Sequence, residues 1–171
     1  PSLSYDQAKT QLKKLLEDSV QLRLVADVPV GAFLSGGVDS SVIAALAVKH
    51  KPDLHTFSIG FRDDKFFDET AYANAVAKHL KTNHTVFSLT HKDLLDHVDQ
   101  VLNYMDEPFA DSSALNVFIL SKETRKHATV ALSGDGADEL LGGYNKHAAF
   151  NRIINKGWKE NLIGSLAPLW K

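Results

Sequence analysis

The sequence predicts an α/β domain in which a parallel sheet carries helices on both faces. Apolar runs of strand length alternate along the chain with longer runs that have helical spacing. Strands that alternate with helices are typical of parallel sheets with right-handed crossovers. Two of the apolar runs end in Ser-Gly just before a helix-forming run. Because ligands of such sheets bind beyond the carboxyl ends of the strands, both Ser-Gly segments are candidate site segments.

The individual elements follow in order. Residues 4–24 have apolar side chains at helical spacing, and Ser4 with Gln7 forms a capping box that predicts the start of a helix. Asp68 is the expected cap of a later helix. Strands are expected at 30–35, 55–60, 84–89 and 128–133. Further helices are expected at 39–50, 68–81, 91–104, 113–127 and 137–153, whereas the tail at 151–171 has only weak patterning.

The composition limits the classes of function. A chain of 171 residues, 44% hydrophobic and 23% charged, is ordinary for one soluble globular domain. A net charge of −2 argues against nonspecific nucleic-acid binding. The absence of cysteine excludes disulfides, thiolate metal sites and a cysteine nucleophile. No apolar run approaches the roughly 18 residues that span a membrane, so we expect a cytoplasmic protein without membrane or nucleic-acid partners.

The first Ser-Gly segment, residues 34–41, reads Leu-Ser-Gly-Gly-Val-Asp-Ser-Ser. Backbone N–H groups and the positive end of a helix dipole meet at a strand–glycine–helix junction, which favours phosphate. Gly36 and Gly37 allow positive φ and a close approach of backbone to ligand. Asp39 would repel a bare phosphate, so its presence predicts a magnesium ion between them. Hydroxyl donors for phosphate oxygens come from Ser35, Ser40 and Ser41.

This segment is not a Walker loop, because no lysine follows its glycines. It resembles instead the pyrophosphate loop, Ser-Gly-Gly-x-Asp-Ser, of the N-type ATP pyrophosphatases. In that family the loop holds the β- and γ-phosphates of ATP while a substrate oxygen attacks the α-phosphate. The alternative is a simple turn in which Asp39 and Ser40 cap the helix.

The second Ser-Gly segment lies within residues 130–144 and again joins a strand to a helix. Three carboxylates gather there: Asp135 in the turn, and Asp138 and Glu139 in the first helical turn. Acidic side chains suit a helix N-terminus, so capping is the alternative interpretation. Glycines beside the acids, at a second strand end, favour a substrate and magnesium site.

Together these segments resemble the class B, glutamine-dependent asparagine synthetases. The match covers the signature at 133–144 and the connecting segments Phe57-Ser58-Ile59-Gly60-Phe61, Phe67-Asp68-Glu69-Thr70, Glu107-Pro108 and Asp111-Ser112-Ser113. It extends over roughly residues 5–150. The resemblance implies an adenine nucleotide alpha-hydrolase-like (pyrophosphate-loop) fold. It also implies that residues 1–171 are part of a synthetase domain, without the glutaminase domain and the C-terminal remainder.

The resemblance assigns roles position by position. The backbone of Leu34 and Ile59 would meet the adenine of ATP, and Ser133 with Gly134 the ribose side. The positions that match the pyrophosphate loop are Ser35, Gly36, Gly37, Asp39 and Ser40. Asp135 matches an acidic position tied to formation of the β-aspartyl-AMP intermediate. Asp138 and Glu139 match the acids that bind aspartate and lie near the metal. Asp39 and Asp138 are the predicted magnesium ligands.

The implied reaction is the ATP-dependent amidation of aspartate to asparagine through β-aspartyl-AMP. ATP, Mg²⁺, aspartate and ammonia would be the small-molecule partners, and the full-length protein is a candidate homodimer. Ammonia would come from a glutaminase domain, because a chain without cysteine lacks that domain's nucleophile. The best-known members carry glutamate where this chain has Asp135, which is one methylene shorter. The family's lysine has no match here, since Lys156, Lys159 and Lys171 lie in the tail.

Three alternatives stay open. NAD, GMP and tRNA lysidine synthetases share the loop at 35–40 but lack the signature at 133–144, whereas β-lactam synthetase shares both. A nucleotide-binding fragment without turnover is a non-enzymatic alternative. A phosphatase or receiver-like protein would use Asp138 and Glu139 with magnesium but would not need the Ser-Gly-Gly loop.

Overall fold

The computed structural model of the chain describes residues 3–107, 109–155 and 157. Contacts divide the chain into two compact units, Pro1–Gly134 and Asp135–Lys171. Within the described ranges, no helix is long and apolar enough to cross a membrane. The described residues exclude Pro108 and all three of the tail lysines, Lys156, Lys159 and Lys171.

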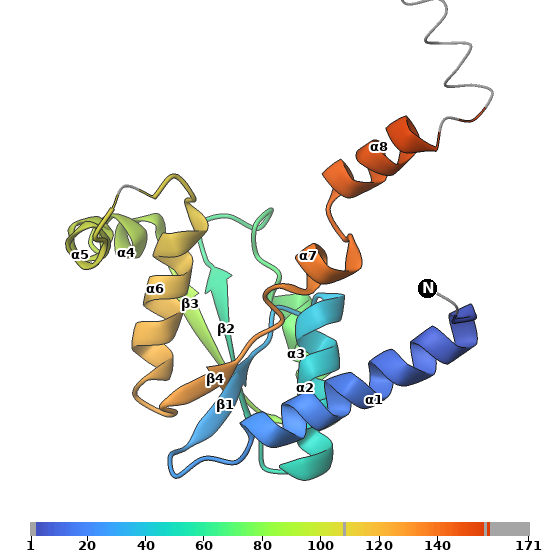
Figure 1. Cartoon of the computed structure of the whole chain (residues 1–171). Helices are drawn as coiled ribbons and strands as arrows, with labels where there is room; N and C mark the ends of the chain where they lie inside the picture. The colour runs from blue at the N-terminus through green and yellow to red at the C-terminus, as the bar shows by residue number, and fades with distance from the viewer. Residues whose placement is uncertain (1–2, 108, 156, 158–171) are drawn as a thin grey trace, which may run out of the picture. The chain divides into compact units, whose positions relative to one another are not determined.

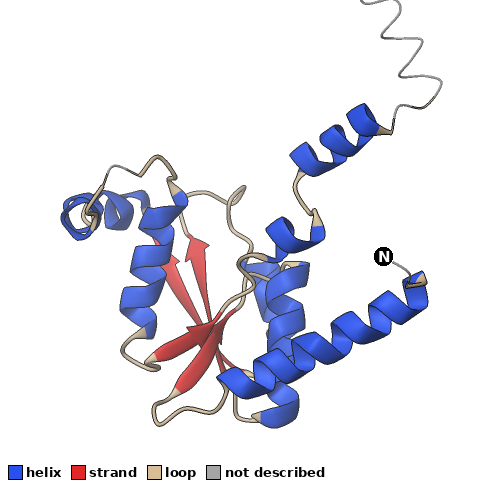
Figure 2. Cartoon of the chain, in the orientation of Figure 1, coloured by secondary structure: helices blue, strands red, loops and turns tan. Residues whose placement is uncertain are grey.

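The first unit is built on a four-stranded parallel sheet with strand order β3-β2-β1-β4, drawn in red in Figure 2. Its strands are β1 (Val30–Phe33), β2 (His55–Phe61), β3 (Asn83–Leu89) and β4 (Val130–Leu132). Gly31 of β1 pairs with His55 on one side and with Ala131 on the other, so β1 is central. The chain order reverses at β1, and α/β sheets bind ligands at such a reversal.

Helices cover both faces of the sheet, which confirms the predicted fold class (Figure 1). Helices α2 (Val38–His50) and α3 (Thr70–Leu80) connect β1 to β2 and β2 to β3, and both lie on one face. The return from β3 to β4 runs the opposite way, so α6 (Ser113–Thr124) lies on the other face. Helix α1 (Tyr5–Arg23) packs against α2.

Local sequence accounts for the start of α1 and the burial of α2. The predicted capping box is present, because Ser4 Oγ accepts from the Gln7 N–H at 3.3 Å and Gln7 Oε1 from the Ser4 N–H at 2.9 Å. The Ala-rich α2 lies between α1 and the sheet, as expected for a helix that is apolar on most sides. The core on this side of the sheet consists of Val20, Val30, Ala32, Leu34, Ala44, Leu46, Ala47, Leu54, Ala73, Ala77 and Leu132.

The predicted single helix at 91–104 is wrong, because the structure has two: α4 (His91–Leu95) and α5 (Val98–Tyr104). The His97 ring Nδ1 lies 2.7 Å from the Asp93 carbonyl oxygen, which a continuous helix would pair with the His97 backbone N–H. That N–H instead donates to Leu94 O at 3.1 Å. The side chain therefore competes with the backbone for one carbonyl, and the helix ends there.

The predicted helix at 137–153 is also two helices, α7 (Ala137–Leu141) and α8 (Asn145–Ile154), which form the described part of the second unit. Gly142 ends α7 with a φ of 71°, in the left-handed region that glycine adopts without strain. Apolar residues continue at helical spacing on both sides of Gly142, so the sequence pattern predicted one continuous helix there. The helix predicted at 68–81 begins later, at Thr70, whose N–H donates to Asp68 Oδ1 at 3.1 Å; Glu69 is the N-cap residue.

Candidate functional site

The segment at 34–37 carries the chain from the central strand to the first turn of α2. The Leu34 N–H donates to Phe57 O at 2.8 Å, which extends the pairing of β1 with β2 by one residue. Gly36 then adopts a φ of 86°. A Cβ atom at Gly36 would lie 2.5 Å from the backbone of Tyr72 and of Ala73, in the first turn of α3. The loop is therefore tight against α3, and only glycine fits at this position.

Three serine hydroxyls hold the shape of this loop. Ser35 Oγ and Ser40 Oγ lie 3.0 Å apart, and Ser40 Oγ accepts the Ser35 N–H at 3.2 Å. Ser35 Oγ also accepts the Gly37 N–H at 3.2 Å. The hydroxyls of Ser40 and Ser41 donate to Gly37 O at 3.3 and 2.6 Å. The serines that the sequence proposed as phosphate donors thus also bond within the loop.

The N-terminus of α2 supplies backbone donors rather than a side-chain cap. Gly37 is the N-cap residue and has no side-chain capping bond, so the alternative in which Asp39 and Ser40 cap the helix is wrong. The first helical bond runs from the Ser41 N–H to Gly37 O at 3.1 Å. The N–H groups before it, those of residues 38–40, have no partner one helical turn earlier. Such groups at the positive end of a 13-residue helix favour an anion.

The turn after β4 lies against the same helix start. A Cβ atom at Gly134 would lie 2.8 Å from Ser40 N and 2.9 Å from the carbonyl carbon of Asp39. The sequence predicted a shared site for the two Ser-Gly segments, and within the first unit the 133–134 turn does reach the loop. Both segments stand at carboxyl ends of neighbouring strands, at the chain reversal beside β1.

The Asp39 carboxylate is available for a cation. It is partly buried, and it has no hydrogen bond or ion pair with any residue that the structure describes. Across the described ranges, no group of three or more His, Asp or Glu side chains forms a site for a metal ion. A Mg²⁺ ion at Asp39 would need oxygens from elsewhere, and magnesium commonly takes them from water and substrate phosphates. A single carboxylate beside backbone donors fits a magnesium–phosphate pair.

The predicted adenine contacts lie at the ends of two adjacent strands. Leu34 follows β1 and is 1% exposed, and Ile59 lies in β2 with partial exposure. Because the Leu34 N–H already pairs with β2, it is not a donor for a base. Gly60, next to Ile59, is closely packed too: a Cβ atom there would lie 2.5 Å from Thr70 Cγ2. The expected roles of Leu34, Ile59 and Ser133 toward ATP stay predictions.

The acidic residues Asp135, Asp138 and Glu139 all belong to the second unit. Gly136, with a φ of 89°, is the N-cap residue of α7, and Asp138 and Glu139 lie in the first turn of this helix. The Tyr144 hydroxyl donates to Glu139 Oε1 at 2.6 Å. This hydrogen bond, aided by a backbone hydrogen bond, lowers the pKa of the Glu139 carboxyl below its ordinary value. Glu139 is therefore held as a carboxylate.

Two glycines shape the end of this acidic turn. The Gly143 N–H donates to Asp138 O at 3.0 Å, and a Cβ atom at Gly143 would overlap the Asp138 carboxylate. The backbone therefore closes around Asp138. The magnesium pair Asp39 and Asp138 takes one ligand from each unit and stays a prediction, as do the roles of the three acids.

Sequence reasoning assigned no role to two residues that shape these segments. Tyr144 closes the signature at 133–144, but its contact with Glu139 spans five positions and matches no helical spacing. The backbone of Tyr72, in α3, packs against Gly36 and leaves no room for a side chain there. The signals in the sequence were the glycines of the two segments, because glycine tolerates positive φ and the close approach of another backbone.

Comparison with known sequences gives a consistent set of relatives. The sequence profile of the asparagine synthase family matches residues 11–168. A putative glutamine-hydrolyzing asparagine synthetase 2 of Methanocaldococcus jannaschii is 44% identical over 98% of this chain, which spans 33% of that relative. A glutamine-hydrolyzing asparagine synthetase 1 of Bacillus subtilis is 39% identical over 82% of the chain and 22% of the relative. The chain thus spans a third or less of these relatives' length.

Solved structures agree on the fold. An NH₃-dependent NAD synthetase from Campylobacter jejuni, in complex with nitrate, has a TM-score of 0.52 at 16% identity, over 80% of this chain and 60% of that one. An NMN synthetase from Francisella tularensis has a TM-score of 0.53 at 19% identity, over 85% and 61%. At such identities the likeness concerns the fold alone, and it confirms the adenine nucleotide alpha-hydrolase-like fold that the sequence predicted.

Proposed function

Since the chain belongs to the asparagine synthase family, we propose that it supplies the ATP-binding part of an enzyme that converts aspartate to asparagine. The observation that carries the proposal is the loop at 34–40. A positive-φ glycine, backbone donors at the start of α2 and an unpaired Asp39 carboxylate meet there at the chain reversal of the sheet. This combination suits a triphosphate with its magnesium ion.

The proposed chemistry proceeds in two steps. An oxygen of the aspartate β-carboxylate attacks the α-phosphorus of ATP, the bond to the bridging oxygen breaks, and pyrophosphate leaves. Ammonia then attacks the β-carbonyl of aspartyl-AMP, loses a proton, and AMP leaves with the electron pair of the broken C–O bond. Adenylation is needed because a carboxylate oxygen is a poor leaving group.

Each candidate residue has a part in this scheme. Residues 35–40 would hold the β- and γ-phosphates through backbone N–H groups and serine hydroxyls. Asp39 and Asp138 would hold Mg²⁺, which neutralises charge on the leaving pyrophosphate. Asp135 and Glu139 would act on aspartate and on the intermediate. Adenine would lie at Leu34 and Ile59, and the ribose would lie at the turn of Ser133 and Gly134.

The partners follow from the same scheme. Aspartate, ATP and ammonia are the proposed substrates, with ammonia delivered by glutamine hydrolysis, as the relatives' names indicate for those proteins. We propose a cytoplasmic location. A homodimer of the full-length protein stays a prediction.

Calorimetric titration of the chain with ATP and MgCl₂ tests the first element of the proposal. We expect saturable binding that Asp39→Ala weakens at least about tenfold, since the loss of a charged ligand group removes more than about 1.4 kcal/mol. Asp53→Ala is the matched control, because Asp53 is an exposed acid that pairs with Lys51 in a loop before β2. Equal ATP affinity of wild type and Asp39→Ala would contradict the assigned loop.

Aspartate-dependent exchange of labelled pyrophosphate into ATP then tests the reaction. Exchange with aspartate, but not with glutamate, supports adenylation of aspartate. ATP binding without exchange under any carboxylate would support a nucleotide-binding fragment and would contradict turnover by this chain.

A further inference from the structure

A hollow lies on the face of the sheet that α6 covers, and its lining includes no residue of α2 or of the loop at 34–40. This cavity of about 680 Å³ opens between α5, α6 and the strands β1 and β4. A volume of this size is typical of sites for small organic molecules. It lies wholly within the first unit. Its lining consists of Phe33, Gln100, Tyr104, Phe118, Ser121, Lys122, Thr124, Arg125, Ala128, Thr129 and Ala131.

A buried hydroxyl without a partner lines this cavity. Thr124 is 3% exposed, and its Oγ1 is one of only two buried side-chain polar atoms in the described ranges that have no hydrogen bond. An unpaired buried hydroxyl costs about 1–3 kcal/mol of stability. A ligand in the cavity is a natural partner for this group, because Thr124 is one of the residues that line it.

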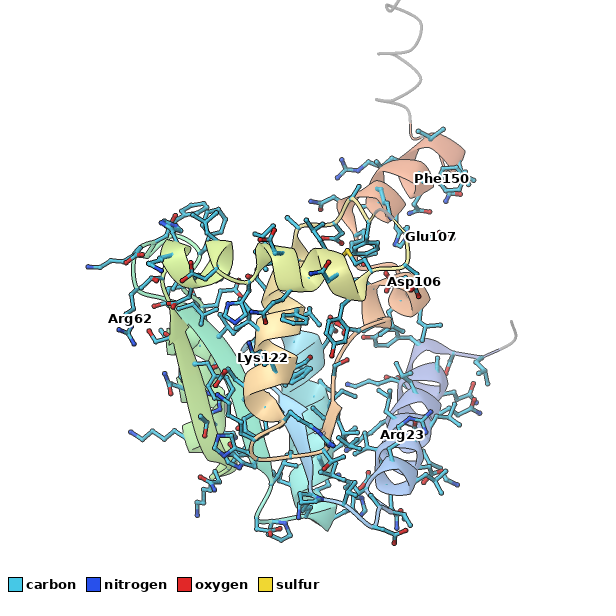
Figure 3. The ribbon with its side chains drawn as sticks, turned by 90° about the vertical axis from the view of Figure 1, so that its left-hand side faces the viewer. Arg23, Arg62, Asp106, Glu107, Lys122 and Phe150 are labelled. Carbon is cyan, nitrogen blue, oxygen red and sulfur yellow. The ribbon has the colours of Figure 1, made fainter. Side chains whose placement is uncertain are left out.

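The charged groups of the lining are all cationic. Lys122 and Arg125 are three residues apart at the end of α6, and no Asp or Glu is among the described residues that line the cavity. Lys122 Nζ lies 3.0 Å from Gln100 Oε1 and 3.1 Å from His97 Nε2, and Arg125 has no ion pair among the described residues. Figure 3 shows Lys122 on α6 in front of the sheet. By contrast, the neighbouring Lys126 pairs with Glu123 and does not line the cavity.

Aromatic rings form the apolar part of the wall. Tyr104 of α5 and Phe118 of α6 are in edge-to-face contact, with ring centroids 5.6 Å apart. Phe33, at the end of β1, adds a third ring from the sheet. Flat apolar groups pack well on such rings, and Tyr104 is 82% exposed and therefore accessible.

We propose that this cavity binds a small organic anion with a flat aromatic body. Its carboxylate or phosphate would bond to Arg125 and Lys122, and its ring would pack on Phe118 and Tyr104. The Thr124 hydroxyl would donate to, or accept from, a polar atom of the same molecule. This site is separate from the proposed ATP site and does not depend on the proposed reaction.

Calorimetry with 2-naphthoate, and with neutral 2-naphthamide as the matched compound, tests the proposal on the 171-residue chain. We expect saturable 1:1 binding of the acid and at least about tenfold weaker binding of the amide, since charge-assisted bonds to Arg and Lys are the stronger ones. The double variant K122Q/R125Q should bind 2-naphthoate at least about tenfold more weakly than the wild type does. K126Q, which changes the same charge outside the lining, should not.

A second variant separates ligand contact from folding. Thr124→Val keeps the shape of the side chain and removes the unpaired hydroxyl, so its thermal midpoint should not fall, while its affinity for 2-naphthoate should fall by about threefold to tenfold. Asp39→Ala should bind 2-naphthoate like the wild type, which keeps failure here distinct from failure of the ATP site. Equal affinity for acid and amide, an equal loss in K126Q, or no saturable binding by folded wild type at millimolar 2-naphthoate would each overturn the proposal.

Discussion

The two Ser-Gly segments of this chain look alike in sequence but are held by different means. Each follows a strand-like run, contains glycines and leads into a helix whose first turn is acidic. The segment at 34–41 is held by distant parts of the chain, because Gly36 packs on α3 and Asp39 on Gly134. Within the segment at 135–144, Gly136 and Gly142 have positive φ and the Tyr144 hydroxyl bonds to Glu139. Similar motifs thus use glycine in different ways: for close approach to a distant segment at Gly36 and Gly134, and for a left-handed turn in open space at Gly136.

Substitution of Gly36 should break the first segment most severely. Gly36→Ala forces a φ of 86° on an L-residue and overlaps the α3 backbone at 2.5 Å. We expect a loss of about 3 kcal/mol or more in the free energy of unfolding, measured by urea titration with circular dichroism. Gly37→Ala is the control, since Gly37 has a φ of −65° and the nearest atom is Ser35 Oγ at 3.3 Å. It should cost less than about 1 kcal/mol, and equal losses would contradict the packing argument.

Gly134 and Gly136 test the contrast directly, two positions apart. A Cβ at Gly134 meets the α2 backbone at 2.8 Å, whereas nothing lies within 4 Å of one at Gly136. We expect Gly134→Ala to lower the free energy of unfolding by about 2 kcal/mol and to weaken ATP binding. Gly136→Ala should cost only about 1 kcal/mol, from its φ of 89°. A reversed order, in the same urea titrations, would show that local strain outweighs the tertiary contact.

A decrease in pH should weaken the sheet before it affects the acidic turn. Burial lowers the pKa of His55 and of His84 below the ordinary 6.5, and repulsion from His127 adds to the effect at His55. The unfolded chain therefore binds more protons, so stability present above pH 6.5 is lost as the pH falls below 6.5. The lowered pKa of Glu139 affects stability at lower pH. The stability that it contributes is present above pH 4.5 and is lost as the pH falls through the pKa of the folded state.

Urea titrations at pH 7.5 and 5.5 measure this difference. His84 Nδ1 lies 2.8 Å from Thr56 Oγ1 and Nε2 lies 3.3 Å from Ser58 Oγ, across β2 and β3. His84→Gln removes the titrating group, so the drop between the two pH values should shrink. The exposed His79→Gln is the control and should leave the drop unchanged. A drop that persists in full in His84→Gln would exclude His84 as its source.

The smallest effect is expected at the surface of the second segment. Tyr144→Phe removes the hydroxyl that donates to Glu139, so the pKa of Glu139 should rise toward 4.5. Because both side chains are exposed, this is the smallest effect on stability that we expect. Carbon-detected NMR titration of the Glu139 carboxyl measures the shift, with Tyr5→Phe as a control far away in the sequence. An unchanged pKa in Tyr144→Phe would exclude the hydroxyl as its cause.

Most of the fold could be predicted, because its signals are local. The alternation of apolar runs predicted all four strands and the helices on both faces. The capping box at Ser4 and Gln7 was predicted from two residues and is present. The two wrong helices failed for local reasons that spacing cannot show: the His97 ring competes for the Asp93 carbonyl, and Gly142 turns left-handed.

The candidate site was only partly predictable. The loop at 34–40 carries its own signature of glycines, serines and Asp39, so its phosphate chemistry could be proposed from residue types. The cavity beneath α6 had no such signature, since its lining comes from four separate segments between Phe33 and Ala131. Lys122 and Arg125 alone read as ordinary surface cations. Their meaning depends on the described residues that line the cavity with them, none of which is Asp or Glu, and sequence spacing does not show which residues those are.

The sequence by itself thus determined the parallel α/β architecture and the glycine turn between β1 and α2, because the hydrophobic period and the conformational freedom of glycine act over a few neighbouring residues. Only the tertiary structure decided why Gly36 and Gly134 must be glycine, and that a cationic cavity forms on the opposite face. Those features arise where segments far apart in the chain approach within van der Waals distance. Close packing rejects a single added carbon atom there, and no local pattern records which backbone will be the neighbour.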